Sequence, residues 1–513
     1  MHLTQALHRY VRQSPQACAA CDERSALSWA ELADRVARFA GALKRDGLQP
    51  GDRVALLARN QVDYLVYVLG VFWAGGVITP VNWRWSPAEI AASLLDSGTR
   101  FLLLAEEFIA IAGDVLPQTP DVSRVVAMTE RPPDAMIAYE EWLAGAPPVP
   151  DALRKEDDLA ALMYTGGTTG RPKGVMLSHA NIAASNFGIL VATDAPATKV
   201  HLHVAPLFHI GALSNLFLAL TVGATSVLLP VFDPPALVAA VNRWRVTELF
   251  LVPTMIRLVI DHPDFRAGGL PSVRRLRYGA AAIDEALLDR AMAALPGADF
   301  VQAYGMTELG PVATVLPPSD HLPERRTAAR LRSAGRATPT CEVRILDPDG
   351  AERSAGETGE ILARGPNVML GYWQDPDATA QVLRNGWMHT GDLGFMDADG
   401  YLTVVDRLQD MIVTGGENVY SAEVENVLAT HPDVAQAAVI AVPDTLWGER
   451  VHAVIVPRAG AQPRCESIVA HCRPRLAGYK LPRSLTLVEE LPLSPAGKVL
   501  KSALRQRALK EKW

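Results

Sequence analysis

The sequence predicts an α/β protein in which a large composite N-terminal domain, built on doubly wound sheets, precedes a small α+β C-terminal domain. Its length of 513 residues is more than one ordinary domain holds. The chain is 49% hydrophobic and 20% charged, and it contains 38 Gly and 37 Pro, so it can bury a sizeable core between frequent turns. Short apolar runs alternate with helical patterns, which is typical of βαβ units.

The first long helix is recognisable from its N-terminal residues. Ser28 and Glu31 form a capping-box pair, and Asp46-Gly47 ends the helical pattern. Apolar residues follow the cap at helical spacing, at Leu32, Val36, Phe39 and Leu43. The alternation then continues with a helix at 64–73 and with strands at 53–57, 77–80, 101–104, 226–229, 248–252 and 276–278.

The pattern changes near residue 400. We expect a strand at 400–406, a charged link at 407–410, a second strand at 411–414 and then a helix capped by Ser421. The inward side of this helix carries Val424, Val427 and Leu428. We therefore place the N-terminal domain at 1–406, a hinge at 407–410 and the C-terminal domain at 411–513.

Composition limits the partners. The net charge of -7 and the pI near 6.0 argue against nucleic acid as a partner. Two uncharged runs, 65–83 and 200–232, are interrupted by Gly and Pro, so we expect buried helix–strand pairs and no membrane span. An odd, sparse set of cysteines fits a reducing compartment, and we expect a cytoplasmic protein: Cys18, Cys21, Cys341, Cys465 and Cys472.

The segment at 159–174 carries the clearest chemical signal. A short apolar strand leads into a loop rich in glycine and threonine, followed by a lysine: Thr165, Gly166, Gly167, Thr168, Thr169, Gly170 and Lys173. Glycines let backbone N–H groups approach an anion, and the hydroxyls and the lysine add donors and positive charge. The loop predicts a polyphosphate site. It is not a Walker A loop, because Pro172 stands where the second glycine would be needed.

Together with five later motifs, this loop resembles the acyl-adenylate-forming superfamily of acyl-CoA synthetases, amino-acid adenylation domains and luciferases. The resemblance covers essentially the whole chain. The later motifs are YGMTE at 304–308, WMHTGD at 387–392, DR at 406–407, GGEN at 415–418 and SPAGK at 494–498. The resemblance implies attack of a carboxylate on the α-phosphate of ATP, followed by transfer of the acyl group to a thiol, with ATP, Mg²⁺ and coenzyme A as cofactors and co-substrates.

The resemblance also implies roles for individual residues. Lys498 would contact the carboxylate and the α-phosphate, and Glu308 would hold the Mg²⁺ ion as the metal ligand. The remaining ATP and AMP contacts would come from the phosphate loop and from Gly279, Ala280, Ala281, Tyr304, Thr307, Asp392 and Arg407. For the second half-reaction, the small domain would rotate about the hinge and bring the coenzyme A residues into place: Gly415, Gly416, Trp447, Tyr479 and Arg483.

Two residues depart from the family pattern. Gly166 stands where a serine is usual, which removes one hydroxyl donor. Gln409 occupies the hinge position that is commonly Lys or Asp, and a neutral side chain there would alter the balance between domain orientations.

The residues expected around the acid indicate its class. His209 replaces the Asp that pairs with an amino-acid substrate, and Ala303 replaces the Arg that binds a second carboxylate in malonate-type relatives. The expected pocket is small and apolar, with His209 also as a catalytic candidate that gates the acyl tunnel: His209, Ile210, Gly211, Leu213, Ala303, Leu309 and Val312.

We therefore predict an AMP-forming acyl-CoA synthetase that acts on an apolar monocarboxylic acid, with a fatty acid first. The alternative acid is an aryl acid of the hydroxycinnamate or benzoate type. The alternative function of a different class is a catalytically impaired sensor that binds acyl groups and nucleotides. A carrier-protein thiol as acceptor and a homodimer remain open.

Overall fold

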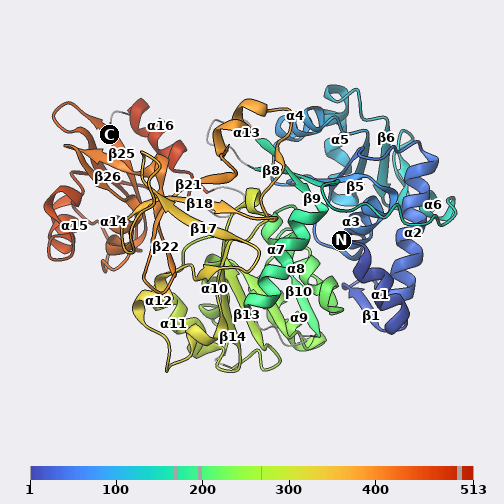
Figure 1. Cartoon of the computed structure of the whole chain (residues 1–513), viewed down its shortest axis with the longest axis horizontal. Helices are drawn as coiled ribbons and strands as arrows, with labels where there is room; N and C mark the ends of the chain where they lie inside the picture. Colours follow the sequence, from blue (N-terminus) through green and yellow to red (C-terminus); the bar gives the residue numbers. More distant parts are fainter. Residues whose placement is uncertain (1, 166–171, 194–198, 267, 494–498, 512) are drawn as a thin grey trace. The chain divides into compact units, whose positions relative to one another are not determined.

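The computed structural model describes residues 2–165, 172–193, 199–266, 268–493, 499–511 and 513 (Figure 1). The chain divides into two compact units. The first contains Met1–Val343 and Ala363–Met388, and the second contains Arg344–Leu362 and His389–Trp513. The sequence predicts two domains, 1–406 and 411–513, that rotate about a hinge at 407–410. These limits stay a prediction.

An eight-stranded sheet carries the first βαβ units. Its order is β19-β9-β8-β4-β3-β5-β6-β7. The predicted unit β3–α3–β4 is present with parallel strands, since Arg53 pairs with Val77. The strands in sheet order are Gly371–Tyr372, Lys173–Ser178, Leu159–Thr165, Val77–Pro80, Arg53–Leu57, Phe101–Ala105, Arg124–Met128 and Ile137–Ala138.

A nine-stranded sheet forms the other half of the first unit, in the order β16-β15-β14-β13-β12-β10-β11-β1-β2. Its central strands β10 to β14 run parallel. The strands in sheet order are Arg336–Ala337, Thr314–Leu316, Asp299–Tyr304, Arg275–Gly279, Glu248–Leu251, Val200–His203, Thr225–Leu228, Cys18–Cys21 and Ala26–Ser28. Both sheets confirm the predicted α/β class.

Helices of the first unit pack on these sheets through apolar side chains. Ser28 and Glu31 form the predicted capping box at the start of α2. Residues of α9, α10 and α11 pack on one face of the nine-stranded sheet, while α8 lies against β10 and β11. The helices α1 to α13 are Gln5–Gln13, Trp29–Arg45, Val62–Ala74, Pro87–Ser97, Ala112–Val115, Tyr139–Ala144, His179–Ala192, Ile210–Val222, Pro234–Trp244, Pro253–Ile260, Glu285–Ala294, Ala328–Arg332 and Pro376–Val382.

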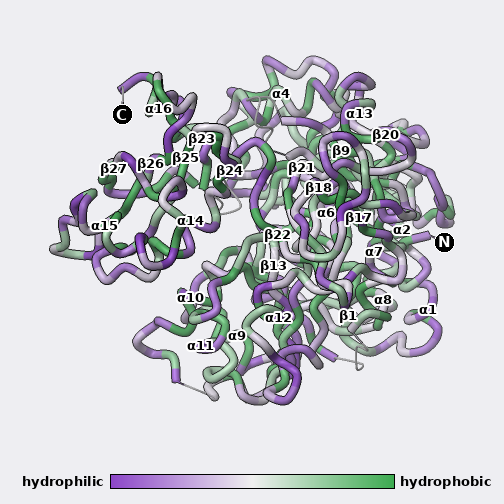
Figure 2. The backbone as a smooth tube through the Cα atoms, turned by 60° about the vertical axis from the view of Figure 1, so that its left-hand side comes forward, coloured by the Kyte–Doolittle hydropathy of each residue, from purple (hydrophilic) through white to green (hydrophobic). Residues whose placement is uncertain are grey.

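A five-stranded sheet in the order β17-β18-β21-β20, with β22 paired to β21, follows in the chain. Its strands are Glu342–Leu346, Gly359–Arg364, Trp387–Met396, Leu383–Arg384 and Leu402–Arg407. The C-terminal part has its own sheet, β24-β23-β26-β25, with β27 paired to β26. These strands are Glu417–Val419, Ile412–Thr414, Gly448–Pro457, Val434–Asp444 and Ser484–Leu487. Figure 2 shows hydrophobic stretches along this sheet and hydrophilic loops around it.

Three helices accompany the C-terminal sheet: α14 (Ser421–Leu428), α15 (Cys465–Cys472) and α16 (Lys501–Glu511). The prediction that Ser421 caps α14 is wrong. Ser421 is the first helical residue, and its backbone N–H and its hydroxyl both donate to the carboxylate of Asp406. A carboxylate from a neighbouring strand thus takes the capping role, which local sequence could not indicate.

The two long apolar runs are buried helix–strand pairs, as predicted. The first run contains most of α3 and all of β4, and the second contains α8 between β10 and β11. In the described part of the chain, no helix has both the length and the apolar character that a membrane crossing requires.

Candidate active site

The phosphate loop connects β8 and β9, which form an antiparallel hairpin. Thr165 pairs with Lys173 at the loop end of this hairpin, so the last residue before the loop and the first lysine after it face each other. The five loop residues between them that we assigned to ATP lie outside the described residues: Gly166, Gly167, Thr168, Thr169 and Gly170.

A tyrosine connects this hairpin to the expected metal ligand. The ammonium group of Lys173 lies 4.9 Å from the centre of the Tyr372 ring. The Tyr372 hydroxyl donates a hydrogen bond of 2.9 Å to Oε1 of Glu308. Burial, with the nearby Glu308 carboxylate, raises the pKa of Tyr372, so its hydroxyl remains a donor at neutral pH. The structure thus brings together a cation, a phenol and a carboxylate from three distant parts of the sequence.

The chain around Glu308 is folded tightly on itself. After β14, Ala313 N–H donates to the carbonyl of Tyr304, which closes the segment. A Cβ at Gly305 would lie 2.0 Å from the carbonyl oxygen of Pro311, so only glycine fits this close approach. Met369 N–H donates 2.8 Å to the Glu308 carbonyl. These contacts fix the buried Glu308 beside Thr307, the first residue of the short 3-10 helix Thr307–Leu309.

The residues expected to frame the adenine follow β13. Gly279 ends this strand and pairs with Ala303 of β14. Ala280 has a φ of 63°, in the left-handed region that alanine rarely adopts. Ala280 and Ala281 are both exposed. An exposed, strained alanine directly after a buried strand is the kind of backbone outlier that gathers at ligand sites.

The expected acyl-pocket residues fall into separate environments. His209 precedes the first residue of α8, is half-buried, and lies with its ring 4.3 Å from that of Phe208. Ala303 and Val312 pack in one small apolar cluster. The main core of the unit contains Ile210, Leu213 and Leu309. Gly211 is half-buried, and a Cβ there would meet only Phe250.

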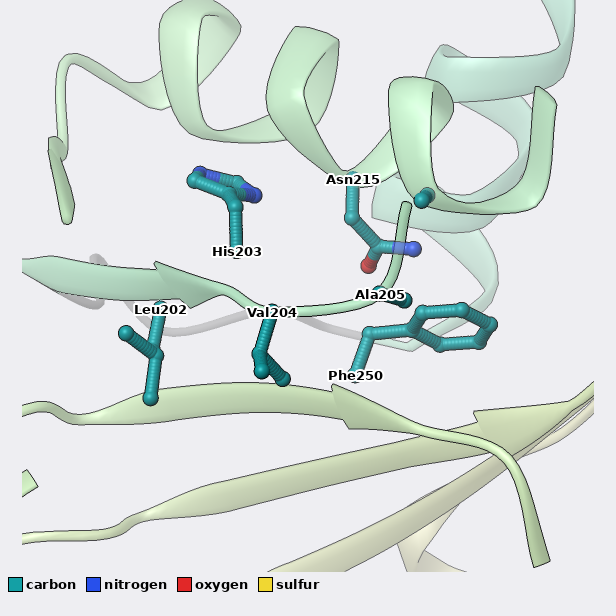
Figure 3. Close-up of a pocket in the computed structure, with 7 residues that line it drawn as sticks. Leu202, His203, Val204, Ala205, Asn215 and Phe250 are labelled. Carbon is teal, nitrogen blue, oxygen red and sulfur yellow. The ribbon is translucent and has the colours of Figure 1, made fainter. Parts of the chain in front are cut away.

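A small cavity lies under the start of α8 (Figure 3). Its volume is about 10 Å³, near the minimum that one water molecule or one oxygen substituent needs. Figure 3 shows Asn215 reaching down from α8, His203 rising from β10 and the Phe250 ring beside them. The cavity is lined by Leu202, His203, Val204, Ala205, Ala212, Asn215 and Phe250.

Two polar side chains, Asn215 and His203, provide hydrogen-bonding groups in the wall of this cavity. The Asn215 amide donates 2.8 Å to the Gly211 carbonyl, so its carbonyl oxygen can still accept from a guest. His203 contacts the Ser226 hydroxyl at 3.2 Å, and burial lowers the pKa of His203 to about 3, which keeps the ring neutral.

Strand register places this cavity relative to the expected acyl pocket. His201 pairs with Glu248, so His203 lies level with Phe250. Gly279 and Ala303 stand two residues further along parallel strands, at their carboxyl ends. Two residues of a strand span about 6.6 Å. The His203 and Phe250 side of the cavity is therefore about two residues further from the carboxyl edge of the sheet than Ala303.

The second unit contains the expected ribose contacts. Asp392 of β21 pairs with Arg407 of β22, and Arg407 Nε lies 3.4 Å from Asp392 Oδ1. The structure thus brings these two residues together. The carbonyl of Gln409, in the expected hinge, accepts a long hydrogen bond of 3.4 Å from Arg505.

The expected coenzyme A residues gather on the C-terminal sheet. Gly415 and Gly416 form the two-residue turn between β23 and β24, with φ of 60° and 85°. Gly415 N–H donates to the Trp447 carbonyl, and the Arg483 guanidinium lies 4.5 Å from the centre of the half-exposed Trp447 ring. Tyr479 is also partly exposed. Lys498 lies outside the described residues.

The sequence alone missed Tyr372 and the cavity residues. Tyr372 belongs to a two-residue strand with no motif around it, and its partners Lys173 and Glu308 are far away in the sequence. Asn215 and His203 read as ordinary residues of a buried helix and a buried strand. Only the uncharged run at 200–232, with its few polar side chains, could have drawn attention to them.

The residues present fit a magnesium ion. Among the residues that the structure describes, no group of three or more His, Cys, Asp or Glu could hold a metal. Mg²⁺ usually takes only one or two protein carboxylates together with waters and the phosphates of its substrate. The buried carboxylate of Glu308, near the end of the phosphate hairpin, suits that mode of binding.

Comparisons with known proteins agree with this geometry. The model of AMP-binding enzymes matches residues 7–373, and that of the AMP-binding enzyme C-terminal domain matches residues 423–498. A feruloyl-CoA synthase from an Amycolatopsis species is 42% identical and covers 97% of each chain. The fatty acid–acyl-carrier-protein ligase ScoC from Streptomyces coeruleorubidus is 36% identical over 98% of this chain and 96% of its own.

Solved structures extend the similarity to the fold. The ATP-bound MatB from Rhodopseudomonas palustris has a TM-score of 0.89 at 30% identity and covers 99% of each chain. The predicted superfamily, fold class and enzymatic nature are thereby confirmed. The chain belongs to the family of AMP-binding enzymes, and it is an AMP-forming acid–thiol ligase that uses ATP, Mg²⁺ and coenzyme A.

Proposed function

We propose that this ligase activates an apolar monocarboxylic acid in two half-reactions at one site. In the first, a carboxylate oxygen forms a bond to the α-phosphorus of ATP while the bond to pyrophosphate breaks. In the second, the sulfur of coenzyme A forms a bond to the acyl carbon while AMP leaves. The contact series Lys173–Tyr372–Glu308 carries this proposal, because it arranges cation and carboxylate at the end of the phosphate hairpin.

In the first half-reaction, negative charge concentrates on the phosphates, and fixed donors lower the barrier. Lys173 and the phosphate loop bind the β- and γ-phosphates, while Lys498 neutralises charge at the α-phosphate. Glu308 would hold Mg²⁺, which would supply positive charge to offset the negative charge of the phosphates. Asp392 accepts from the ribose hydroxyls, and Arg407 beside it orients that carboxylate.

Replacement of Lys498 tests the division into two half-reactions. Lys498→Ala should abolish adenylation, measured as exchange of radiolabelled pyrophosphate into ATP. It should leave thioester formation from supplied acyl-AMP largely intact, because the small domain then presents the turn at Gly415 in place of Lys498. Equal loss of both steps contradicts the use of different residues in the two steps.

For the acid, we propose an aryl-propenoic acid with a hydroxyl group at its far end. The carbonyl oxygen of Asn215, which lines the cavity under α8, offers an acceptor to a hydroxyl substituent of the acid. The relative with 42% identity is a feruloyl-CoA synthase, which supports the same class. A fatty acid is the second candidate, supported by the apolar pocket residues and by ScoC.

A substrate screen with one variant pair separates these candidates. We expect hydroxycinnamates to give a higher kcat/KM than fatty acids of any chain length. Asn215→Leu should lower kcat/KM for 4-hydroxylated cinnamates by about 10-fold, because one hydrogen bond is lost, with little change for unsubstituted cinnamate. The neighbouring Ser214→Ala is the control, since Ser214 bonds to Asn186 away from the cavity. A preference for long-chain acids would favour the second candidate.

We also propose that a carrier-protein thiol does not replace coenzyme A as the acceptor, that the protein is cytoplasmic and that it forms a homodimer. Coenzyme A and ATP are abundant in the cytoplasm, and the five cysteines are free thiols. Thioester formation with free coenzyme A, compared with a carrier protein, tests the acceptor. Light scattering of the purified protein tests the dimer.

A further inference from the structure

A network of charged side chains joins the last helix of the chain to the expected hinge. Asp406, the residue before Arg407, is buried and accepts from the backbone N–H and, at 2.7 Å, from the hydroxyl of Ser421. The same Ser421 hydroxyl accepts a 2.5 Å hydrogen bond from the ammonium group of Lys501, at the start of α16. One serine therefore connects strand β22, which leads into the hinge, to the C-terminal helix α16.

The charge of Lys501 is balanced within this network. Its ammonium group lies 2.8 Å from Oε1 of Glu425 on α14, and its side chain is 13% exposed. The Glu425 carboxylate also accepts from Val439 N–H of β25. A mostly buried ion pair of this kind holds its geometry more firmly than an exposed pair, because solvent screens it less.

One turn further along α16, a second cation reaches the hinge itself. Arg505 donates 2.7 Å to Oδ1 of Asp410 and a longer bond to the carbonyl of Gln409. Lys501 and Arg505 are four residues apart and therefore lie on the same face of the helix. Leu504 and Ala508 pack α16 against an apolar cluster of the C-terminal sheet.

The chain before α16 is held as well. Leu493 and Val499 form an antiparallel bridge, and Leu500 N–H donates 2.8 Å to the Pro492 carbonyl. Lys498 thus lies in the sequence between the two bridged residues, Leu493 and Val499. Lys501 follows Lys498 by three residues. The described residues on either side, Leu493 and Val499, belong to the same unit as residues 407–410.

We propose that Lys501 and Arg505 are positioning residues, which together form a hinge latch with Ser421, Glu425 and Asp410. The latch holds α16 in a fixed place relative to the hinge, so that the orientation of the hinge determines where Lys498 is delivered. This inference rests on the proposed role of Lys498 in adenylation. It assigns a task to residues that contact neither ATP nor the acid.

The test separates positioning from general stability by measuring both half-reactions. Lys501→Met should lower the rate of pyrophosphate exchange at least about 10-fold, since small misplacements of a catalytic group are costly. Thioester formation from supplied acyl-AMP should change less than about 3-fold, because Lys498 does not act in that step. Lys501→Arg, which keeps the cation, should recover most of the exchange activity.

A pair of arginines on the same helix provides the matched control. Arg505→Met removes the bond to the hinge and should lower pyrophosphate exchange selectively. Arg507→Met removes an exposed pair with Glu511 and should leave both half-reactions unchanged. The proposal is overturned if Lys501→Met and Arg505→Met each lose both half-reactions equally. It is also overturned if both variants fold and keep full pyrophosphate exchange.

Hydrogen exchange distinguishes failure of the latch from failure of the proposed function. In Lys501→Met, amides at 499–505 and 407–411 should exchange faster, whereas those of β25 and β26 should not. If the wild-type protein shows no pyrophosphate exchange with any acid, the proposed function fails. The hydrogen exchange of the backbone amides still decides whether the latch exists. If Lys501→Met does not fold, Arg505→Met and Lys501→Arg carry the same comparison, and unchanged amide protection in Arg505→Met contradicts the latch.

Discussion

At the scale of single residues, the hydrogen bond from Tyr372 to Glu308 is the contact on which the expected metal site depends most directly. Tyr372→Phe removes only the hydroxyl and leaves the ring under Lys173. A hydrogen bond to a charged group contributes about 1.5–3 kcal/mol, so adenylation should fall roughly 10- to 100-fold. Pyrophosphate exchange at increasing Mg²⁺ concentration measures this, and higher Mg²⁺ should recover part of the loss.

A second buried tyrosine provides the comparison. The Tyr139 hydroxyl donates 3.1 Å to Asp63, a pair of the same chemistry away from the proposed site. Tyr139→Phe should change stability but not the Mg²⁺ dependence of adenylation. If both variants lose exchange activity alike, Tyr372 has no special relation to the metal site.

Which candidate residues lie close together was predictable from the sequence where they belong to a local motif, while their roles stay a prediction. Thr165 and Lys173 stand at the ends of one hairpin, and Asp392 and Arg407 pair across neighbouring strands. Tyr372 was not predictable, because its role comes from packing between segments far apart in the chain. The cavity residues were missed for the same reason.

At the scale of elements, the turn between β23 and β24 makes a separate prediction. Gly415 has a φ of 60°, and a Cβ there would lie 2.7 Å from Cε3 of Trp447. Gly415→Ala therefore combines a strained backbone with a clash against the expected coenzyme A surface. Thioester formation should fall at least about 10-fold, while pyrophosphate exchange stays near the wild-type rate. Single-turnover assays of each half-reaction measure both.

Gly400→Ala is the matched control for this turn. Gly400 also has a positive φ, of 80°, but no atom lies within 4 Å of the position of its Cβ. The control therefore introduces backbone strain alone. A selective loss of thioester formation in Gly400→Ala as well would attribute the effect at Gly415 to strain rather than to the coenzyme A surface.

Elements were predicted well where buried strands and capping boxes define them, as at β3, α3, β4 and the Ser28 cap. The start of α14 was not, because a carboxylate from β22 supplies its cap. Periodicity and local caps are properties of the sequence, whereas a cap from another strand exists only after folding.

At the scale of the whole molecule, buried histidines make stability depend on pH. Burial lowers the pKa of four histidines from 6.5: to about 3 for His203 and to about 4 for His179, His321 and His452. Their contribution is fully present above pH 6.5 and is lost as pH falls toward 4, because the unfolded chain then binds protons that the folded chain does not. The melting temperature should therefore fall between pH 7 and pH 5.

One substitution isolates part of this effect. His321 accepts from the Tyr278 hydroxyl at Nε2 and contacts the Pro317 carbonyl through Nδ1. His321→Gln retains one acceptor and one donor group but binds no proton. Below pH 6, the His321→Gln variant should lose about 1.4 kcal/mol less of its unfolding free energy per pH unit than the wild-type protein does. Urea unfolding at pH 5, 6 and 8 measures the slope, and an unchanged slope would mean that His321 binds its proton equally in the folded and the unfolded protein.

The left-handed conformation of Ala280 has an evolutionary consequence. A residue held in this region costs about 1–2 kcal/mol, and a glycine in its place would relieve much of that cost. If the strained backbone helps to shape the nucleotide site, selection for heat resistance and selection for turnover would favour different residues at this position. A library screened only for thermal survival should therefore enrich glycine at 280, and the enriched clones should be slower enzymes.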